Sequence, residues 1–209
     1  MRRRYTAGFT VTEMLLVLGI GLVLAVLLVS VTGGAIRSAN LSKCAVHLRN
    51  IWTAGRSYAA DHNGVMPPNQ ANGTIFAASL RPYLGEEGLS KANSLKHSIL
   101  VCPADKEVYA PGYGLSYAQN GYIGAASGPA ATRISRVVAS WEQPARMALY
   151  LDYELHYVAS APTWKEEKVA LLARRHEGKI NVVFGDGHVE AVMMTHLDWN
   201  VPNPFWQGR

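Results

Sequence analysis

The sequence predicts an α+β fold in which a long N-terminal helix packs by its C-terminal half on a small antiparallel sheet. Three observations predict it: an uncharged apolar run near the N-terminus, an amphipathic pattern directly after it, and strand-like segments around a glycine-rich turn near the C-terminus. The chain has 209 residues. Without its apolar stem it keeps roughly 160, enough for one domain with its own core.

The apolar run extends from Met14 to Val31 and contains no charged residue. A helix of this length rises about 27 Å, close to the hydrocarbon thickness of a bilayer. Arg2, Arg3 and Arg4 precede the run, and a positive flank holds that end of a spanning helix in the cytoplasm. The alternative is an ordinary secretory signal, which has a shorter apolar core and small residues at its cleavage site; small residues do follow here, from Ser30 to Ala35.

The segment from about residue 38 to residue 63 has an amphipathic pattern. Apolar or small residues recur in it at spacings of three and four: Leu41, Ala45, Leu48, Ile51, Trp52, Gly55, Tyr58 and Ala59. This pattern predicts a helix that lays one stripe on a core. Asn63-Gly64 and Pro67-Pro68 predict its end. We therefore expect one helix of roughly fifty residues that is first apolar all round and then amphipathic.

The middle of the chain, from Val65 to about Arg136, is rich in Gly, Pro, Asn and Tyr and predicts loops. We expect one short strand there, at Ile99–Val101. Four tyrosines in this region could form a binding face: Tyr109, Tyr113, Tyr117 and Tyr122. Half-buried packing with the hydroxyl in water is the commoner role of such tyrosines, and we expect it here.

The C-terminal part predicts a sheet. Met147–Leu151 and Val169–Ala173 are strand candidates. Ile180–Phe184 and His188–Val192 flank the turn sequence Gly185-Asp186-Gly187 and predict a β-hairpin.

The net charge of +5 does not indicate a nucleic-acid-binding protein. Three of the five positive charges come from the arginines before the apolar run, and the rest of the chain has no basic stripe with interleaved aromatic residues. The sequence also contains no nucleophile motif, no phosphate-binding glycine loop and no pair of histidines at helical spacing. We therefore expect no enzyme, no cofactor and no metal.

The chain has two cysteines, Cys44 and Cys102. In an exported protein they can form a disulfide, which would stabilise the fold by about 4 kcal/mol in the chain-entropy model. Two unlinked thiols are the alternative, because a sequence does not show whether the two Cα atoms lie close enough.

A short motif, Gly8-Phe9-Thr10-Val11-Thr12-Glu13, stands directly before the apolar run. A carboxylate at the edge of a spanning helix is unfavourable, so Glu13 needs a partner unless it is solvated at the level of the lipid headgroups.

Gly-Phe-Thr-x-x-Glu followed by a long apolar run resembles the class III leader of type IV prepilins and type II secretion pseudopilins. The resemblance implies that a prepilin peptidase cleaves after Gly8 and methylates the new N-terminal residue, Phe9. Glu13 would then pair with the amine of a neighbouring subunit. Residues 1–8 would be the leader, residues 9–36 the transmembrane stem and residues 37–209 an exported, pilin-like head.

In this interpretation the protein is a structural subunit, a pilin or pseudopilin of a type IV pilus-like or type II secretion-like fibre. Its partners are the prepilin peptidase, the inner membrane, and copies of itself or other pilin-like subunits. The N-terminus is cytoplasmic, and the head lies in the periplasm or on an extracellular fibre. The alternative is a membrane-tethered module whose aromatic loops, near Tyr109–Tyr122 and Trp141, bind a carbohydrate or another envelope ligand.

A second stretch also carries a family resemblance. His176 and Asp186-Gly187 are separated by nine residues, which is similar to the His-x9-Asp-Gly C-terminal module of a large prepilin-like family of planctomycetes, verrucomicrobia and their relatives. Further matching pieces are Cys44 with Leu48-Arg49-Asn50-Ile51, Tyr58 to Gly64 before Pro67-Pro68, Cys102-Pro103, and Ser116 to Asn120. The family is defined by sequence rather than by activity.

A metal or acid–base site made of His176, Asp186 and His188 is not expected. A strand at Ile180–Phe184 spans about 17 Å and would hold His176 and Asp186 apart. Asp186-Gly187 is more simply a turn pair, and His188 beside it could partner Asp186, Asp152 or neither.

Overall fold

The computed structural model describes residues 9–71, 74–86, 98–105, 115–124, 134–153, 157–158, 175–196 and 204–208. The chain forms two compact units, Met1–Ala39 and Asn40–Arg209, and each is described by itself. Several predictions lie outside the described residues: cleavage after Gly8, a binding face with Tyr109 and Tyr113, and a strand at Val169–Ala173.

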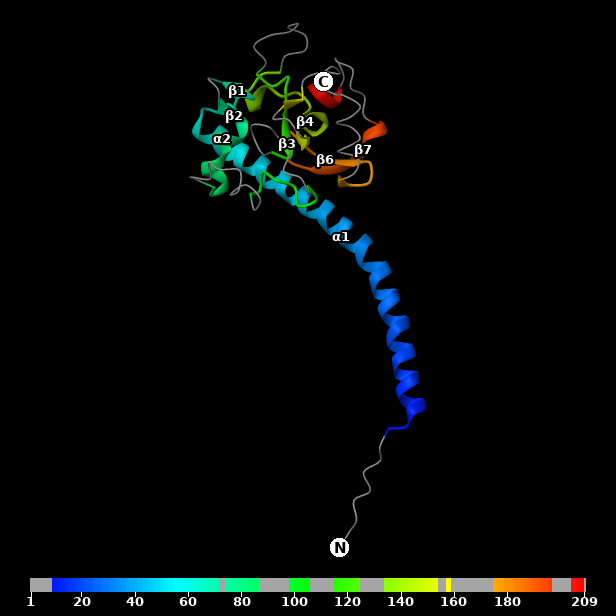
Figure 1. The fold of residues 1–209 in the computed structure, drawn as a ribbon. Coiled ribbons are helices and arrows are strands. Elements are labelled where there is room, and N and C mark those ends of the chain that lie inside the picture. The colour runs from blue at the N-terminus through cyan, green and yellow to red at the C-terminus, as the bar shows by residue number, and fades with distance from the viewer. Residues whose placement is uncertain are drawn as a thin grey trace. The chain divides into compact units, whose positions relative to one another are not determined.

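Helix α1 extends from Val11 to Asp61 without a break, as the two consecutive patterns predict (Figure 1). In the first unit every side chain from Phe9 to Leu28 is exposed, although most are apolar. One 18-residue window of α1 has a mean hydropathy of 3.0, so the helix is long and apolar enough to cross a membrane. A signal sequence near an N-terminus has the same features.

In the second unit α1 turns one stripe to a core. Its fully buried side chains are Cys44, Leu48, Ile51, Ala54 and Ala59. The helix ends where Asn63 and Gly64 take positive φ angles of 54° and 77°, and the Gly64 N–H donates to the Ala59 carbonyl at 2.7 Å. This left-handed cap satisfies a terminal carbonyl, and it confirms the predicted end of the helix to within two residues.

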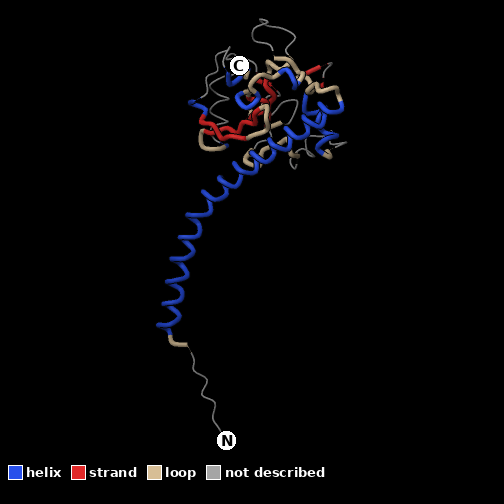
Figure 2. The backbone as a smooth tube through the Cα atoms, turned by 180° about the vertical axis from the view of Figure 1, so that it is seen from behind, coloured by secondary structure: helices blue, strands red, loops and turns tan. Residues whose placement is uncertain are grey.

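The second unit contains one five-stranded sheet in the order β5-β3-β4-β6-β7 (Figures 1 and 2). Its strands are β3 (Tyr117–Asn120), β4 (Ala148–Asp152), β5 (Tyr157–Val158), β6 (Lys179–Phe184) and β7 (Val189–Met193). Four of the strands pair antiparallel, and the two-residue β5 lies parallel to β3. The strand predicted at Met147–Leu151 and the predicted hairpin are confirmed by β4, β6 and β7.

The remaining elements of the second unit are short. Strands β1 (Gln70–Ala71) and β2 (Thr74–Ile75) form a two-stranded ribbon, followed by α2 (Phe76–Leu80). Helix α4 (Pro204–Gln207) lies near the C-terminus. Single 3₁₀ turns are found at Arg81–Leu84, Val138–Ser140, Pro144–Arg146 and Met194–His196.

Each face of the sheet is covered, and strand β6 shows the alternation most clearly. Val183 belongs to the core cluster that contains Leu48 and Ile51 of α1. Ile180, Val182 and Phe184 belong to a second cluster, with Trp206 of α4. Because neighbouring side chains on a strand point to opposite faces, α1 covers one face of the sheet and α4 helps to cover the other.

The strand predicted at Ile99–Val101 is wrong, because Ser98–Val101 forms a turn. The N–H of Ile99 donates to Glu86 Oε1 at 2.7 Å, and the N–H of Leu100 donates to Ser98 Oγ at 2.9 Å. Local side-chain acceptors thus take the backbone donors that a strand would offer to a neighbour.

Strand β3 was not predicted, because its sequence Tyr-Ala-Gln-Asn looks like a polar loop. All four residues are buried. The Gln119 side-chain amide donates to the Pro67 carbonyl at 3.1 Å, and that of Asn120 donates to the carbonyls of Ala148 and Trp206 at 2.7 and 2.8 Å. Backbone acceptors therefore satisfy these buried amides, and they make polar residues compatible with a central strand.

The turn between β6 and β7 lies directly against α1. The Trp52 indole N–H donates to the Gly185 carbonyl at 3.2 Å. Gly187 has a φ of +96°, and a Cβ atom at this position would stand 2.8 Å from Cζ2 of Trp52. Only glycine meets both the backbone and the space requirement here.

We predict that Gly187→Ala lowers the free energy of unfolding by about 2–4 kcal/mol, since it adds a steric overlap to left-handed strain. Gly64→Ala is the matched control, because Gly64 also has a positive φ but has nothing within 4 Å of an added Cβ. The control should lose only about 1 kcal/mol. Urea unfolding in detergent, followed by near-ultraviolet circular dichroism, measures both, and equal losses would show that the Trp52 contact is unimportant.

Candidate functional site

The start of α1 is a capping box. The Glu13 carboxylate accepts hydrogen bonds from the backbone N–H and the hydroxyl of Thr10, both at 2.8 Å. In return the Glu13 N–H donates to Thr10 Oγ1 at 3.3 Å. This reciprocal pairing satisfies two of the free donors at a helix N-terminus, and it explains why α1 begins at Val11. The Thr-x-x-Glu spacing at residues 10–13 could have indicated it from the sequence.

The capping box gives Glu13 hydrogen bonds but leaves its charge in place, because Thr10 is neutral. Glu13 and Phe9 are both exposed. The single chain therefore presents an exposed carboxylate at the start of an exposed apolar helix, held in position by its own backbone.

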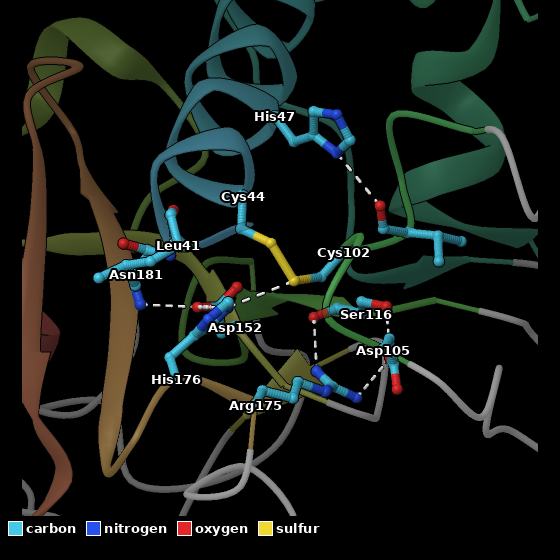
Figure 3. A network of polar contacts seen from close by, with 11 residues as sticks. Leu41, Cys44, His47, Cys102, Asp105, Ser116, Asp152, Arg175, His176 and Asn181 are labelled. Atoms are coloured by element: carbon cyan, nitrogen blue, oxygen red, sulfur yellow. Dashed lines mark hydrogen bonds and ion pairs between the residues drawn. A yellow bond between two sulfur atoms is a disulfide. The ribbon is translucent and has the colours of Figure 1, made fainter. Parts of the chain in front are cut away.

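A disulfide joins Cys44 of α1 to Cys102, with 5.3 Å between the Cα atoms (Figure 3). Both residues are fully buried. The bond closes a loop over a sequence separation of 58, which corresponds to about 4 kcal/mol in the chain-entropy model. One turn further along α1, His47 Nδ1 donates to the Val101 carbonyl at 3.1 Å. The segment Ser98–Asp105 is thus tied to α1 by one covalent and one hydrogen bond.

His176 lies beside this disulfide. Its Nε2 is 3.3 Å from Cys102 Sγ and 3.7 Å from Oδ2 of Asp152, the last residue of β4. Both side chains are 1% exposed. The Asn181 N–H donates to the same Asp152 oxygen at 2.7 Å, and the Asn181 side-chain amide donates to the Leu41 carbonyl of α1 at 3.2 Å. A disulfide, an imidazole and a carboxylate therefore meet in the core.

A buried ion pair adjoins this group (Figure 3). Arg175 Nη2 lies 2.6 Å from Asp105 Oδ2, and the Ser116 hydroxyl donates to the same oxygen at 2.6 Å. Arg175 also donates to the Ser116 carbonyl at 3.4 Å. Asp105, at the end of the Ser98–Asp105 segment, is thus connected to Arg175 and to Ser116, the residue before β3.

Burial shifts the pKa values of Asp152 and His176 in opposite directions, so that the carboxyl has the higher value. Desolvation raises the pKa of Asp152 to about 7, although the Asn181 N–H and Arg175 oppose the rise. Desolvation, with the Arg175 charge, lowers the pKa of His176 to about 4. Both groups are therefore neutral between these values. Asp152 Oδ1 and His176 Nδ1 are also buried without a hydrogen-bond partner among the described residues.

Asp186 and His188 form a separate pair at the opposite end of β6. Asp186 Oδ1 accepts from the His188 N–H at 3.1 Å and lies 2.7 Å from His188 Nδ1. The His188 ring stacks on Phe184 with 4.3 Å between centroids. Both polar side chains are partly open to solvent. This is a turn pair of the predicted kind, since the carboxylate bonds the local backbone.

The structure therefore does not bring His176, Asp186 and His188 together. The six residues of β6 separate the first from the other two by about 20 Å of extended chain. His188 pairs with Asp186, whereas Asp152 is next to His176.

Both ends of the His-x9-Asp-Gly stretch are held against helix α1. At one end of β6, His176 contacts the disulfide to Cys44; at the other end, Gly185 and Gly187 contact Trp52. Cys44 and Trp52 are separated by about 12 Å along the helix. The nine-residue spacing thus accommodates one strand and fastens both of its ends to the same helix. The sequence left this role open.

The described tyrosines of the middle region pack in the core rather than line a binding face. Tyr117 is fully buried, with its ring 6.4 Å from that of His47. Tyr122 is half-buried against Trp206. The Trp141 indole donates to the Ser135 carbonyl at 2.8 Å and lines a cavity of about 90 Å³. That volume is well below the roughly 300–1,000 Å³ of ligand pockets.

Comparison of the chain with protein-family models, with curated proteins and with solved structures finds no match in any of the three.

The neutral Asp152–His176 pair predicts a specific dependence of stability on pH. The raised pKa of Asp152 contributes stability at low pH that is lost as pH rises toward 7. The lowered pKa of His176 contributes stability above its ordinary pKa that is lost as pH falls toward 4. In the wild type the two slopes oppose each other between about pH 4 and pH 6.5.

Asp152→Asn should remove the first slope, so that the free energy of unfolding rises with pH by up to about 1.4 kcal/mol per unit relative to the wild type. His176→Gln should show the opposite sign. Urea titrations at about pH 4.5, 5.5 and 6.5, which lie between the pKa values of His176 and Asp152, measure the free energy of unfolding of both variants. Parallel pH profiles for the two variants and the wild type would contradict this assignment of neutral groups.

Proposed function

We propose that the chain is a structural subunit, a pilin or pseudopilin, of a type IV pilus-like or type II secretion-like fibre. A prepilin peptidase cleaves it after Gly8 and methylates Phe9. The observation that carries the proposal is the order of features at the N-terminus: Gly8-Phe9-Thr10, then Glu13 three residues later, then an apolar helix. The His-x9-Asp-Gly resemblance agrees with it.

The exposed apolar surface of α1 supports this function. From Phe9 to Leu28 every side chain is exposed, and most are hydrophobic. A helix that is apolar all round is stable in a lipid bilayer or against other helices rather than in water. The inner membrane covers this surface before assembly, with the N-terminus in the cytoplasm, and neighbouring subunits cover it in the fibre. The head then lies in the periplasm or on an extracellular fibre.

The charge of Glu13 sets the axial position of each subunit relative to its neighbours in the fibre. Cleavage after Gly8 creates an ammonium on Phe9, and in a staggered bundle this cation neutralises the Glu13 carboxylate of an adjacent subunit. A misplaced subunit leaves both charges unpaired away from water, which costs about 3–5 kcal/mol for a buried pair. The capping box supports this role because it keeps the carboxylate at the helix start.

Mass spectrometry of the mature protein from native cells tests the processing. We predict a chain that begins at Phe9 and carries one methyl group on its amine. A chain that begins near Ala35 would show instead that an ordinary signal peptidase removes the apolar run, and the subunit function would fail with it.

Three variants separate the charge of Glu13 from its capping role. Glu13→Ala removes both. Glu13→Gln keeps an acceptor for the Thr10 donors but removes the charge, whereas Thr10→Val keeps the charge and weakens the cap by about 1 kcal/mol. We predict that both Glu13 variants stay in the membrane but assemble at least about tenfold less well, and that Thr10→Val assembles normally once its processing is verified.

The amount of protein in sheared fibres, relative to the membrane fraction, measures this effect. Normal assembly of Glu13→Gln together with failure of Thr10→Val would show that Glu13 acts through the helix cap and would refute charge pairing.

A further inference from the structure

The core of the head gathers three strong metal-ligating side chains. Cys44 Sγ, Cys102 Sγ and His176 Nε2 all lie within 4.8 Å of one another, and all three residues are buried (Figure 3). A fourth group, the Asp152 carboxylate, has Oδ2 at 3.7 Å from His176 Nε2. Cys44 belongs to α1 and Cys102 to the Ser98–Asp105 segment. His176 precedes β6, and Asp152 ends β4.

Two thiolates, an imidazole and a carboxylate form a ligand set that Zn²⁺ accepts in tetrahedral geometry. Ligand atoms around a tetrahedral zinc ion lie about 3–4 Å apart, since the bonds are about 2.0–2.3 Å long. The distances from His176 Nε2 to Cys102 Sγ, 3.3 Å, and to Asp152 Oδ2, 3.7 Å, fit that requirement, whereas the two bonded sulfur atoms must first move apart. The sulfur atoms are joined in the oxidised chain, and only thiolates bind zinc strongly, so the disulfide must be reduced first.

We propose that the reduced head binds one Zn²⁺ ion through Cys44 Sγ, Cys102 Sγ, His176 Nε2 and the Asp152 carboxylate. Reduction breaks the S–S bond: an external phosphine supplies the two electrons, and water supplies the two protons of the thiols. Zinc binding then displaces into solvent both thiol protons and, where the Asp152 carboxyl is protonated, its proton as well.

Unpartnered atoms in the same cluster support the site. Asp152 Oδ1 is buried and has no hydrogen-bond partner among the described residues, so this oxygen is available to a cation. A buried acceptor without a partner is unusual in a folded protein and indicates a missing ligand or proton. The ion also neutralises most of the charge it gathers, because its two positive charges meet three negative ones beside the Arg175 guanidinium.

The zinc ion would connect the same segments as the disulfide. Cys44 lies on α1 and Cys102 on the Ser98–Asp105 segment, while His176 and Asp152 belong to the sheet side of the core. A reduced head with bound zinc therefore keeps α1 tied to the rest of the fold. Neither the fibre assembly nor the processing proposed above is needed for this inference.

The test uses the full mature chain in detergent. A phosphine reduces the disulfide; it becomes the phosphine oxide, with one water molecule supplying the oxygen and the two protons. After removal of trace metal, the protein is incubated with zinc chloride, passed through a desalting column and assayed for zinc by mass spectrometry. We expect one zinc ion per reduced chain and none per oxidised chain. Cobalt(II) should give the visible bands of a tetrahedral ion and a thiolate charge-transfer band.

Variants identify the ligands. His176→Gln and Asp152→Asn should each weaken zinc affinity by at least about tenfold, whereas His188→Gln, which changes the exposed histidine paired with Asp186, should leave it unchanged. Circular dichroism of each oxidised variant verifies that it folds. A reduced wild type that retains no zinc, or unchanged affinity in either His176→Gln or Asp152→Asn, overturns the proposed site.

Discussion

The bond between Cys44 and Cys102 is the constraint on which the second unit of this protein depends. It joins α1 to the Ser98–Asp105 segment, which is also held by the His47 hydrogen bond, by the buried side chain of Leu100 and by a buried ion pair. His176 lies against it and Asp152 lies next to His176, so the residues before β6 and the end of β4 meet near the disulfide. With Gly187 packed on Trp52 at the far end of β6, the sheet is fastened to α1 at two places. The described core is thus packed around one helix, α1.

Helix α1 has two roles along its length, although it is one continuous helix. From Cys44 onward it supplies core residues, whereas from Phe9 to Leu28 it offers an apolar surface that no part of the described chain covers. A subunit proposed to assemble through its N-terminal helix needs a head that stays attached to that helix. A covalent bond, a strand held at both ends and a fully buried stripe on α1 together provide this attachment.

Patterns that depend on local sequence could be predicted, and those that depend on distant neighbours could not. Asn63-Gly64 marked the helix end and Gly185-Asp186-Gly187 the hairpin, since both need positive φ angles that few residues adopt. Strand β3 escaped because its amides find backbone acceptors far away in sequence. The disulfide and the contact of His176 with Asp152 stayed open because they depend on how separate segments meet in space. The capping box at Thr10 and Glu13 is also a local pattern, since it needs only the Thr-x-x-Glu spacing, but it was not predicted.

The most direct test of this construction compares the oxidised protein with the reduced, chelator-treated protein in one hydrogen-exchange and urea-unfolding experiment. If the Cys44–Cys102 bond holds the head to α1, reduction lowers the free energy of unfolding by about 4 kcal/mol. The amides of α1 from Cys44 to Ala59 and those of the Ser98–Asp105 segment should then lose protection together. Unchanged stability and unchanged protection of these amides after complete reduction would contradict the account.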